Sequence, residues 1–140
     1  MKSHQLKVCV AVVITLGFST WVSADEKPNR LFELRKYTTH SGKLKALHAR
    51  FRDHTNQIFQ RHGVELIGYW TPASGDEAKN TLIYMLAYPD KEAREKAWDS
   101  FRQDPDWHKA YKESRENAGG PIVKKVESTF LAPTDYSLIQ

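Results

Sequence analysis

Three side chains of different chemistry alternate along one short segment near the start of the folded region. Glu33, Arg35 and Tyr37 lie two residues apart within Leu31–Thr38, whose alternating apolar and polar character predicts a β-strand. Residues two apart on a strand point to the same side, so these three share one face. If that face lines a cavity, Arg35 could hold a carboxylate or enolate oxygen, and Glu33 could act as a base if burial raised its pKa. The alternative is a structural Glu–Arg pair that holds a dimer together.

A histidine stands among apolar residues on the helix expected to follow. Ser41-Gly42 predicts the helix start, with Ser41 as its cap, and the pattern continues to about His62. His54 could serve there as a general base or a haem ligand, or it could be a buried neutral histidine satisfied by one hydrogen bond. The histidines lack the spacing of a metal site, so we expect no metal and no cofactor. The residues of the stripe are Leu44, Leu47, Phe51, His54 and Ile58.

Aromatic residues and a glycine on the next two strands suit a flat apolar ligand. Gly68 and Trp70 alternate with Tyr69 on the strand predicted over Val64–Thr71, and Tyr84 lies on the strand predicted over Thr81–Tyr88. Together with Tyr37, these residues could line a ligand-binding cavity, in which the glycine leaves room. The alternative is an aromatic dimer core. We interpret three later aromatics as packing anchors and the Lys and Arg residues of both helical regions as solvated; the aromatics are Trp98, Trp107 and Tyr111.

The remaining elements complete a mixed α and β pattern. Pro89-Asp90 predicts the start of a second helical region, which Asp104-Pro105-Asp106 divides. A shorter helix over Trp107–Glu116 and a final strand over Ile122–Leu131 follow. The order β-α-β-β-α-β is that of a ferredoxin-like α+β domain, in which both helical regions cover one face of an antiparallel sheet. We place this domain at residues 31–132, between short tails at 25–30 and 133–140.

The strand Thr81–Tyr88 is apolar on both faces, which predicts a partner for the sheet. The helices can cover one face only, so a second copy of the chain is the economical cover for the other. We therefore expect a homodimer whose two sheets face each other. Leu82, Tyr84, Leu86 and Tyr88 lie on one face of the strand, and Ile83, Met85 and Ala87 on the other.

The first 24 residues have the pattern of a secretory signal peptide. Lys2 and Lys7 precede an apolar stretch over Val8–Phe18, and Val22-Ser23-Ala24 fits the small-residue cleavage rule. We expect cleavage near Ala24, a periplasmic or extracellular location, and no stable membrane insertion after the signal is removed. An uncleaved N-terminal anchor is the alternative.

Composition excludes several classes of protein. The 140 residues carry 21 Lys and Arg against 17 Asp and Glu, and this formal charge of +4 is too mild for a dedicated nucleic-acid binder. The single cysteine excludes a disulfide framework and a thiolate metal site within the chain.

Several segments, in their order, resemble the NIPSNAP family. They are Phe32-Glu33-Leu34-Arg35-Lys36-Tyr37, His62-Gly63 followed by Leu66-Ile67-Gly68-Tyr69-Trp70-Thr71, Leu86-Ala87-Tyr88, Asp104-Pro105-Asp106-Trp107 and Leu131-Ala132-Pro133-Thr134-Asp135-Tyr136-Ser137. The resemblance implies a dimeric α/β-barrel of undefined activity. The wider barrel group includes cofactor-free monooxygenases, haem-handling enzymes, isomerases and non-catalytic members. The better-known eukaryotic members of the NIPSNAP family are usually mitochondrial, whereas we expect this chain to be exported.

Three functional hypotheses remain open at this stage. In the first hypothesis, the chain is an exported dimer that binds a small apolar or carboxylate-bearing molecule in the barrel cavity. Alternatively, it is a cofactor-independent monooxygenase or isomerase that uses Arg35, Glu33 and His54. The third hypothesis is a non-catalytic protein-interaction module whose interior is filled by side chains.

Overall fold

The computed structural model describes residues 30–140, so the predicted signal peptide lies outside the described residues. In chain order, the elements are β1 (Leu31–Thr39), α1 (Leu44–Arg50), a π-helical turn (Phe51–Thr55), α2 (Asn56–Arg61), β2 (Glu65–Trp70), a 3-10 turn (Asp76–Lys79), β3 (Thr81–Tyr88), α3 (Lys91–Gln103), α4 (Pro105–Asn117) and β4 (Val123–Leu131).

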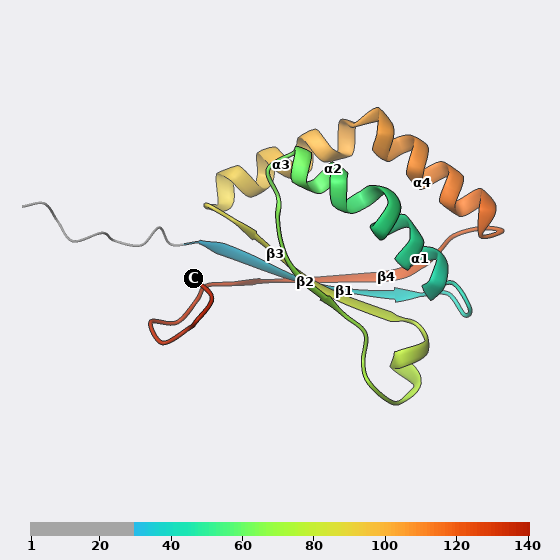
Figure 1. Cartoon of the computed structure of the whole chain (residues 1–140), viewed down its shortest axis with the longest axis horizontal. Coiled ribbons are helices and arrows are strands. Elements are labelled where there is room, and N and C mark those ends of the chain that lie inside the picture. Colours follow the sequence, from blue (N-terminus) through green and yellow to red (C-terminus); the bar gives the residue numbers. More distant parts are fainter. Residues whose placement is uncertain (1–29) are drawn as a thin grey trace, which may run out of the picture.

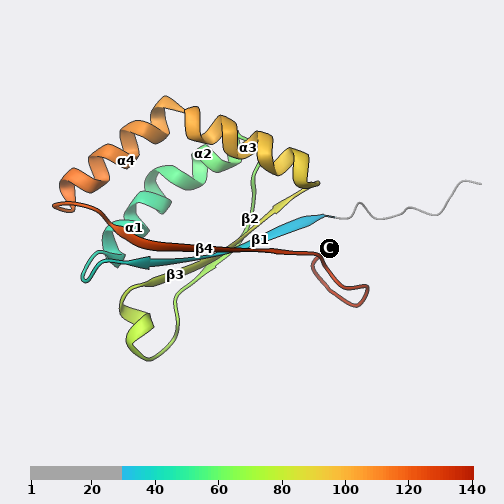
Figure 2. The same ribbon diagram turned by 180° about the vertical axis from the view of Figure 1, so that it is seen from behind.

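The four strands form one antiparallel sheet in the order β2-β3-β1-β4. This is the strand order of the ferredoxin-like fold, so the predicted β-α-β-β-α-β architecture is confirmed. All four helices lie on one side of the sheet, where α1 and α2 run beneath the arch made by α3 and α4 (Figures 1 and 2). The strand register places Arg35 between Tyr84 of β3 and Ser128 of β4.

Aspartate side chains cap the two later helices, and the sequence predicted the first of these starts, at Asp90. The Asp90 carboxylate accepts a hydrogen bond from the Ala93 N–H, and the Asp104 carboxylate accepts one from the Asp106 N–H, both at 2.8 Å. The first helix differs from its prediction, because Ser41 is not its cap. Gly42 has a φ of 71° and forms a tight turn, and α1 begins only after Lys43, which makes no capping side-chain bond.

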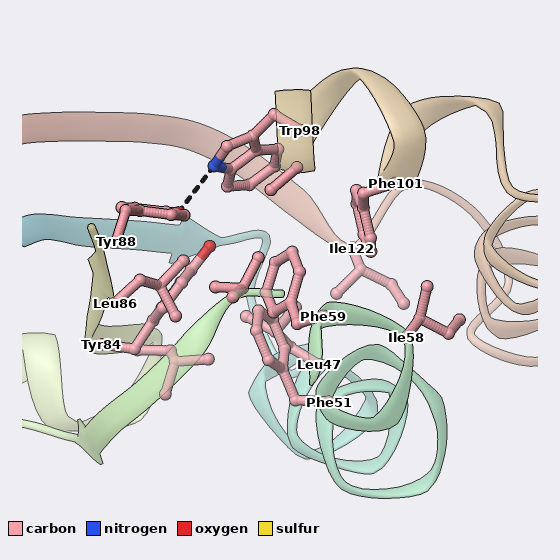
Figure 3. Close-up of a cluster of buried hydrophobic side chains, with 13 residues drawn as sticks. Leu47, Phe51, Ile58, Phe59, Tyr84, Leu86, Tyr88, Trp98, Phe101 and Ile122 are labelled. Atoms are coloured by element: carbon pink, nitrogen blue, oxygen red, sulfur yellow. Dashed lines mark hydrogen bonds between the residues drawn. The ribbon is translucent and has the colours of Figure 1, made fainter. Parts of the chain in front are cut away.

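The core lies between the sheet and the helices (Figure 3). Tyr84, Leu86 and Tyr88 point from β3 toward the helices and are at most 1% exposed. Phe59 contacts both Trp98 and Phe101, with ring centroids 5.3 and 4.5 Å apart. Aromatic packing of this kind fixes the position of α3 over the sheet.

The opposite face of the sheet carries no α-helix among the described elements (Figure 1). Trp70 on this face is 51% exposed, and Ile83 and Met85 are only partly buried. Residues after β4 turn back toward this face, and a cavity of about 240 Å³ separates Phe32 and Met85 from Pro133 and Ile139. Within residues 30–140, no helix is long and apolar enough to cross a bilayer.

Candidate functional site

Glu33 is the centre of a buried polar network on the helix-facing side of the sheet. Its side chain is 0% exposed, and the Arg35 guanidinium donates to its Oε1 at 2.5 Å. Arg94 of α3 donates from Nε to Oε2 and from Nη2 to Oε1, each at 3.0 Å. The Ser128 hydroxyl donates to Oε1 at 2.7 Å. One carboxylate from β1 therefore joins α3 and β4 through charge-assisted hydrogen bonds.

Two aromatic residues extend this network into the core. The Tyr88 hydroxyl donates to Glu33 Oε2 at 3.3 Å, and the Trp98 indole N–H donates to that hydroxyl at 2.8 Å (Figure 3). Arg35 lies over the Trp98 ring, with 4.4 Å between its guanidinium carbon and the ring centroid. Arg35 is thus held by a carboxylate on one side and an indole face on the other.

The environment of Glu33 opposes a role as a base near neutral pH. Burial by itself would raise the pKa of Glu33, but the hydrogen bonds from Arg94 and Ser128 and the charge of Arg35 outweigh it and lower the pKa to about 2. The geometry is that of the structural Glu–Arg pair, although both partners belong to one chain. The face of β1 that carries Glu33 and Arg35 packs under the helices, so the pair joins elements of one chain.

Arg35, Tyr37, Tyr84 and Arg50 form a second cluster next to this network. Arg35 donates to the Tyr37 hydroxyl at 3.3 Å, and the Tyr37 and Tyr84 rings meet edge to face at 5.2 Å. Burial lowers the pKa of Arg35, and both tyrosines raise it. Both tyrosines also raise the pKa of Arg50, although burial keeps that pKa below its ordinary value. Arg50 is therefore within electrostatic reach of the same pair of phenols, while its guanidinium lies against the Trp107 and Tyr111 rings. The cluster places two of the predicted ligand-binding residues, Tyr37 and Tyr84, beside the predicted catalytic residue Arg35.

Three buried polar atoms of this cluster lack a hydrogen-bond partner among residues 30–140. They are Arg35 Nε, Arg50 Nε and the Tyr84 hydroxyl. Arg50 is only 4% exposed and forms no ion pair with a described carboxylate. Burial of a charge without a partner costs several kcal/mol, so an uncompensated guanidinium favours an anion nearby. The chemistry available here is the binding of an oxyanion beside phenolic donors.

His54 lies away from Glu33 and Arg35, in the lining of a cavity of about 240 Å³ that it shares with Arg50, Asp53 and Glu113. It is exposed, and Thr55 occupies the buried position that the helical spacing assigned to His54. The π-helical turn Phe51–Thr55 causes the difference, because a π turn holds more residues than an α turn and rotates the following residues around the axis. The predicted place of His54 on the core stripe is therefore wrong.

Gly68 and Trp70 also lie outside the cluster. Their strand face is the one opposite the helices, since Trp70 pairs with Ile83 and Gly68 with Met85 in the register of β2 and β3. A bulge between Leu66 and Gly68 leaves Tyr69 on the helix side, where its ring stacks on Tyr84 at 5.5 Å. The structure thus divides the predicted aromatic set between the two faces of the sheet, and Tyr69 replaces Trp70 near the cluster.

Sequence reasoning missed several contributors to the site. Arg94 and Arg50 were expected on solvated faces, and Trp98 was expected only to pack. A signal was present, because Arg94 precedes Trp98 by four residues and Arg50 follows Leu47 by three, which places each arginine on the buried side of its helix. Ser128 carries no such signal, because the predicted strand Ile122–Leu131 gives no indication of its neighbour.

The fold and this internal polar site define a ferredoxin-like α+β protein with a charged core between sheet and helices. The NIPSNAP family model matches residues 32–138, and the chain belongs to this family. The resemblance seen in the sequence is therefore confirmed. No curated protein matches the chain.

Solved structures of similar proteins support the same fold. A NIPSNAP domain protein from Burkholderia xenovorans is 25% identical with a TM-score of 0.64, over 76% of this chain and 97% of that one. A NIPSNAP family protein from Agrobacterium tumefaciens is 20% identical with a TM-score of 0.68, over 81% and 96%. Both are described as uncharacterised or of unknown function. SnoaB, a cofactor-independent oxygenase from Streptomyces nogalater, is 13% identical with a TM-score of 0.52, over 80% and 99%.

Proposed function

We propose that this NIPSNAP protein binds a small anionic molecule with a flat apolar body between its sheet and its helices. The observation that carries the proposal is the excess of buried positive charge. Arg35 and Arg94 share the single carboxylate of Glu33, and Arg50 has no carboxylate partner in the described chain. An oxyanion at Arg35 would supply the acceptor that its Nε lacks.

The surroundings of Arg35 suit the apolar body of such a ligand. Tyr37, Tyr84 and Trp98 present ring faces or edges to the guanidinium, and aromatic walls favour flat ligands. We propose entry from the side of the edge strand β4, where Val126 and Phe130 face the helices in the strand register and are 46% and 50% exposed.

Binding of 2-naphthoate tests this proposal, with the fluorescence of the buried Trp98 as the readout and calorimetry as the second measurement. We expect Arg35→Gln to weaken binding at least tenfold and Arg35→Lys to weaken it less, because lysine keeps the charge and loses the planar fork. The exposed Arg102 provides the matched control, since Arg102→Gln makes the same chemical change on the outer surface of α3. Equal binding by all variants, or no binding by the wild type, would contradict the proposal.

Cofactor-independent oxygenase or isomerase chemistry is a second candidate. A guanidinium with two phenol neighbours can stabilise an enolate, and the fold is shared with SnoaB. The exposed position of His54 and the low pKa of Glu33 leave Arg35 as the remaining member of the predicted catalytic set. Uptake of oxygen by the wild type with 1-hydroxy-2-naphthoate, lost in Arg35→Gln, would favour this candidate. Tight binding without oxygen uptake or isomerised product would leave a binding protein. If no ligand binds, the result would support the third hypothesis, a non-catalytic protein-interaction module.

We also propose that the chain acts as a homodimer through the helix-free face of the sheet. Leu34, Ile83 and Met85 form partly buried apolar surface there, next to the exposed Trp70. Met85→Glu should convert a dimer to a monomer in light scattering, whereas Ser100→Glu on the exposed surface of α3 should not. A wild-type monomer would contradict this proposal.

Export is a separate proposal that rests on residues 1–24 of the sequence. The intact mass of the protein recovered from the periplasm or medium should begin at Asp25. Retention of the full chain in the cytoplasm would contradict it.

A further inference from the structure

A cleft between α4 and the helical segment beneath it is lined by charged residues of both signs. The π-helical turn contacts α4, which runs above it (Figures 1 and 2). One cavity in this cleft has a volume of about 240 Å³, and a second has about 220 Å³. The two cavities are neighbours, because they share the lining residues Asp53, His54 and Glu113.

Small residues leave room in the first cavity. Ala46 and Ala49 of α1 and Ala118 after α4 line it with methyl groups, where larger side chains would fill the gap. Ser114 and Asn117 of α4 add polar groups to the same lining. The cavity is therefore a polar space of the size that a small molecule needs.

Arg50 supplies positive charge to this lining. It is 4% exposed, and its Nε has no hydrogen-bond acceptor within residues 30–140. Its guanidinium carbon lies 5.6 Å from the Trp107 ring centroid and 5.2 Å from that of Tyr111. The rings attract the cation but carry no negative charge, so the buried guanidinium still lacks a counter-ion.

Asp53 and Glu113 supply negative charge to the same lining. Both are exposed, and among residues 30–140 neither forms an ion pair with Arg50 or with another residue. Lys109, which lines the second cavity, makes no ion pair with either carboxylate in this part of the chain, and Arg61 is held by the aspartates at the start of α4. Opposite charges thus line one cavity without pairing.

We infer that this cleft binds a small zwitterion of the amino-acid type, with its carboxylate at Arg50 and its ammonium group at Asp53 and Glu113. A simple anion would neutralise Arg50 but would be repelled by the two carboxylates. A simple amine would leave Arg50 without a counter-ion. A molecule that carries both charges satisfies both ends through charge-assisted hydrogen bonds.

This site is separate from the proposed ligand site at Arg35. Neither Arg35 nor Glu33 lines either cavity of the cleft. The inference therefore goes beyond the proposed function and can be tested independently of it.

Matched sets of small molecules test the inference by calorimetry on the full chain. Glycine, β-alanine and γ-aminobutyrate carry their two charges at increasing separation. Each is compared with the acid that lacks the amine (acetate, propionate or butyrate) and with the amine that lacks the acid (methylamine, ethylamine or propylamine). We expect the amino acid whose charge separation matches the cleft to bind at least tenfold more tightly than its acid and its amine.

Two variants test the two ends of the site. Glu113→Gln should weaken the binding of that amino acid at least fivefold and leave the binding of 2-naphthoate within twofold, because Glu113 is exposed and remote from Arg35. Arg50→Met should lower the affinity for the amino acid to that for the amine. Glu116→Gln is the matched control, since it makes the same change on an exposed residue of α4 outside both linings. It should leave the affinity unchanged, and circular dichroism checks the fold of each variant.

The outcomes distinguish this inference from the proposed function. If no amino acid binds more tightly than its acid and its amine, the inference is overturned, whatever the result with 2-naphthoate. If Glu116→Gln weakens binding as much as Glu113→Gln, general electrostatic attraction explains the preference and the inference is again overturned. Failure of 2-naphthoate to bind contradicts the proposed function and leaves the amino-acid measurements to decide the cleft.

Discussion

Arg94 and Glu33 are 61 residues apart in the chain and form a two-pronged ion pair, with both nitrogen–oxygen distances at 3.0 Å. The pair fastens α3 to β1 at the centre of the sheet. Because Arg35 uses the same carboxylate, the position of the proposed ligand-binding arginine depends on the helix above it. The ion pair therefore links the stability of the fold to the geometry of the site.

The charge of Glu33 should contribute to stability in a defined pH range. Its folded pKa of about 2 lies below the ordinary value of 4.5, so the unfolded chain binds more protons between these values. Stability from this group is fully present above about pH 5 and is lost as the pH falls toward 2. Glu33→Gln should destabilise the protein by roughly 3 kcal/mol at pH 7, and the difference should shrink at pH 2.5. Urea unfolding at both pH values measures it.

The exposed Glu95 provides a control for this prediction. It pairs with Lys91 across one turn of α3 at 3.8 Å, and such surface pairs contribute little. Glu95→Gln should change the free energy of unfolding by less than about 0.5 kcal/mol at either pH. An effect of Glu33→Gln that is equally large at pH 2.5 and pH 7 would show that its charge is not the cause.

Replacement of Arg50 should separate stability from binding. A buried guanidinium without a carboxylate costs free energy, so Arg50→Met should stabilise the unliganded protein by about 1 to 2 kcal/mol. The same change should weaken the binding of 2-naphthoate, because it removes part of the buried positive charge that carries the proposed function. Arg94→Met should act in the opposite direction and destabilise by about 3 kcal/mol, because it leaves Glu33 with less neutralising charge. Thermal unfolding with and without ligand measures both; destabilisation by Arg50→Met would contradict the prediction.

The π-helical turn Phe51–Thr55 should tolerate the loss of one residue. Deletion of the exposed His54 would allow a continuous α-helix that keeps both Phe51 and Ile58 in the core. We expect a folded protein with similar far-UV circular dichroism and a cooperative thermal transition. Deletion of the exposed Lys96 from the regular helix α3 is the control. It should unfold the protein, because it rotates Trp98 about 100° relative to the preceding turns. If both deletions unfold the chain, the π turn is not a removable insertion.

Gly68 should be sensitive to any side chain because of Trp70. A Cβ atom at Gly68 would lie 2.6 and 2.8 Å from atoms of the Trp70 ring, so the ring would have to move. Gly68→Ala should shift the Trp70 fluorescence and destabilise by about 1 kcal/mol. In a Trp70→Ala background, the same change should be neutral or stabilising, since the steric conflict is gone. Additive effects of the two substitutions would contradict this account.

The sequence was sufficient for the order and type of the elements. Alternation over β1 and the apolar run of β3 predicted strand bounds that match the structure closely, and Asp90 marked the start of α3. The later helix begins at Pro105, two residues before the predicted Trp107. These features depend on near neighbours in the chain, such as a capping oxygen and the N–H groups of the next turn. Local chemistry therefore determined them before any tertiary contact.

Other features depended on contacts between distant segments. The spacing of Glu33, Arg35 and Tyr37 shows that they share a face, but strand alternation is symmetric and does not say which face the helices cover. The predicted position of His54 was wrong for a related reason. One π turn shifts the helical phase, and packing against the sheet and α4 selects that turn. The bulge in β2 likewise exchanged Tyr69 for Trp70 beside the cluster.

The sequence by itself thus determined the βαββαβ order, the family and which residues could carry charge or rings. Only the tertiary structure decided which of them meet. Arg94 reaches Glu33, and Trp98 reaches Arg35, because the helices fold over the sheet and remove these groups from water. Burial gives their charges the energetic consequences from which a site can be inferred. It is a property of the assembled layers, and no local pattern of residues contains it.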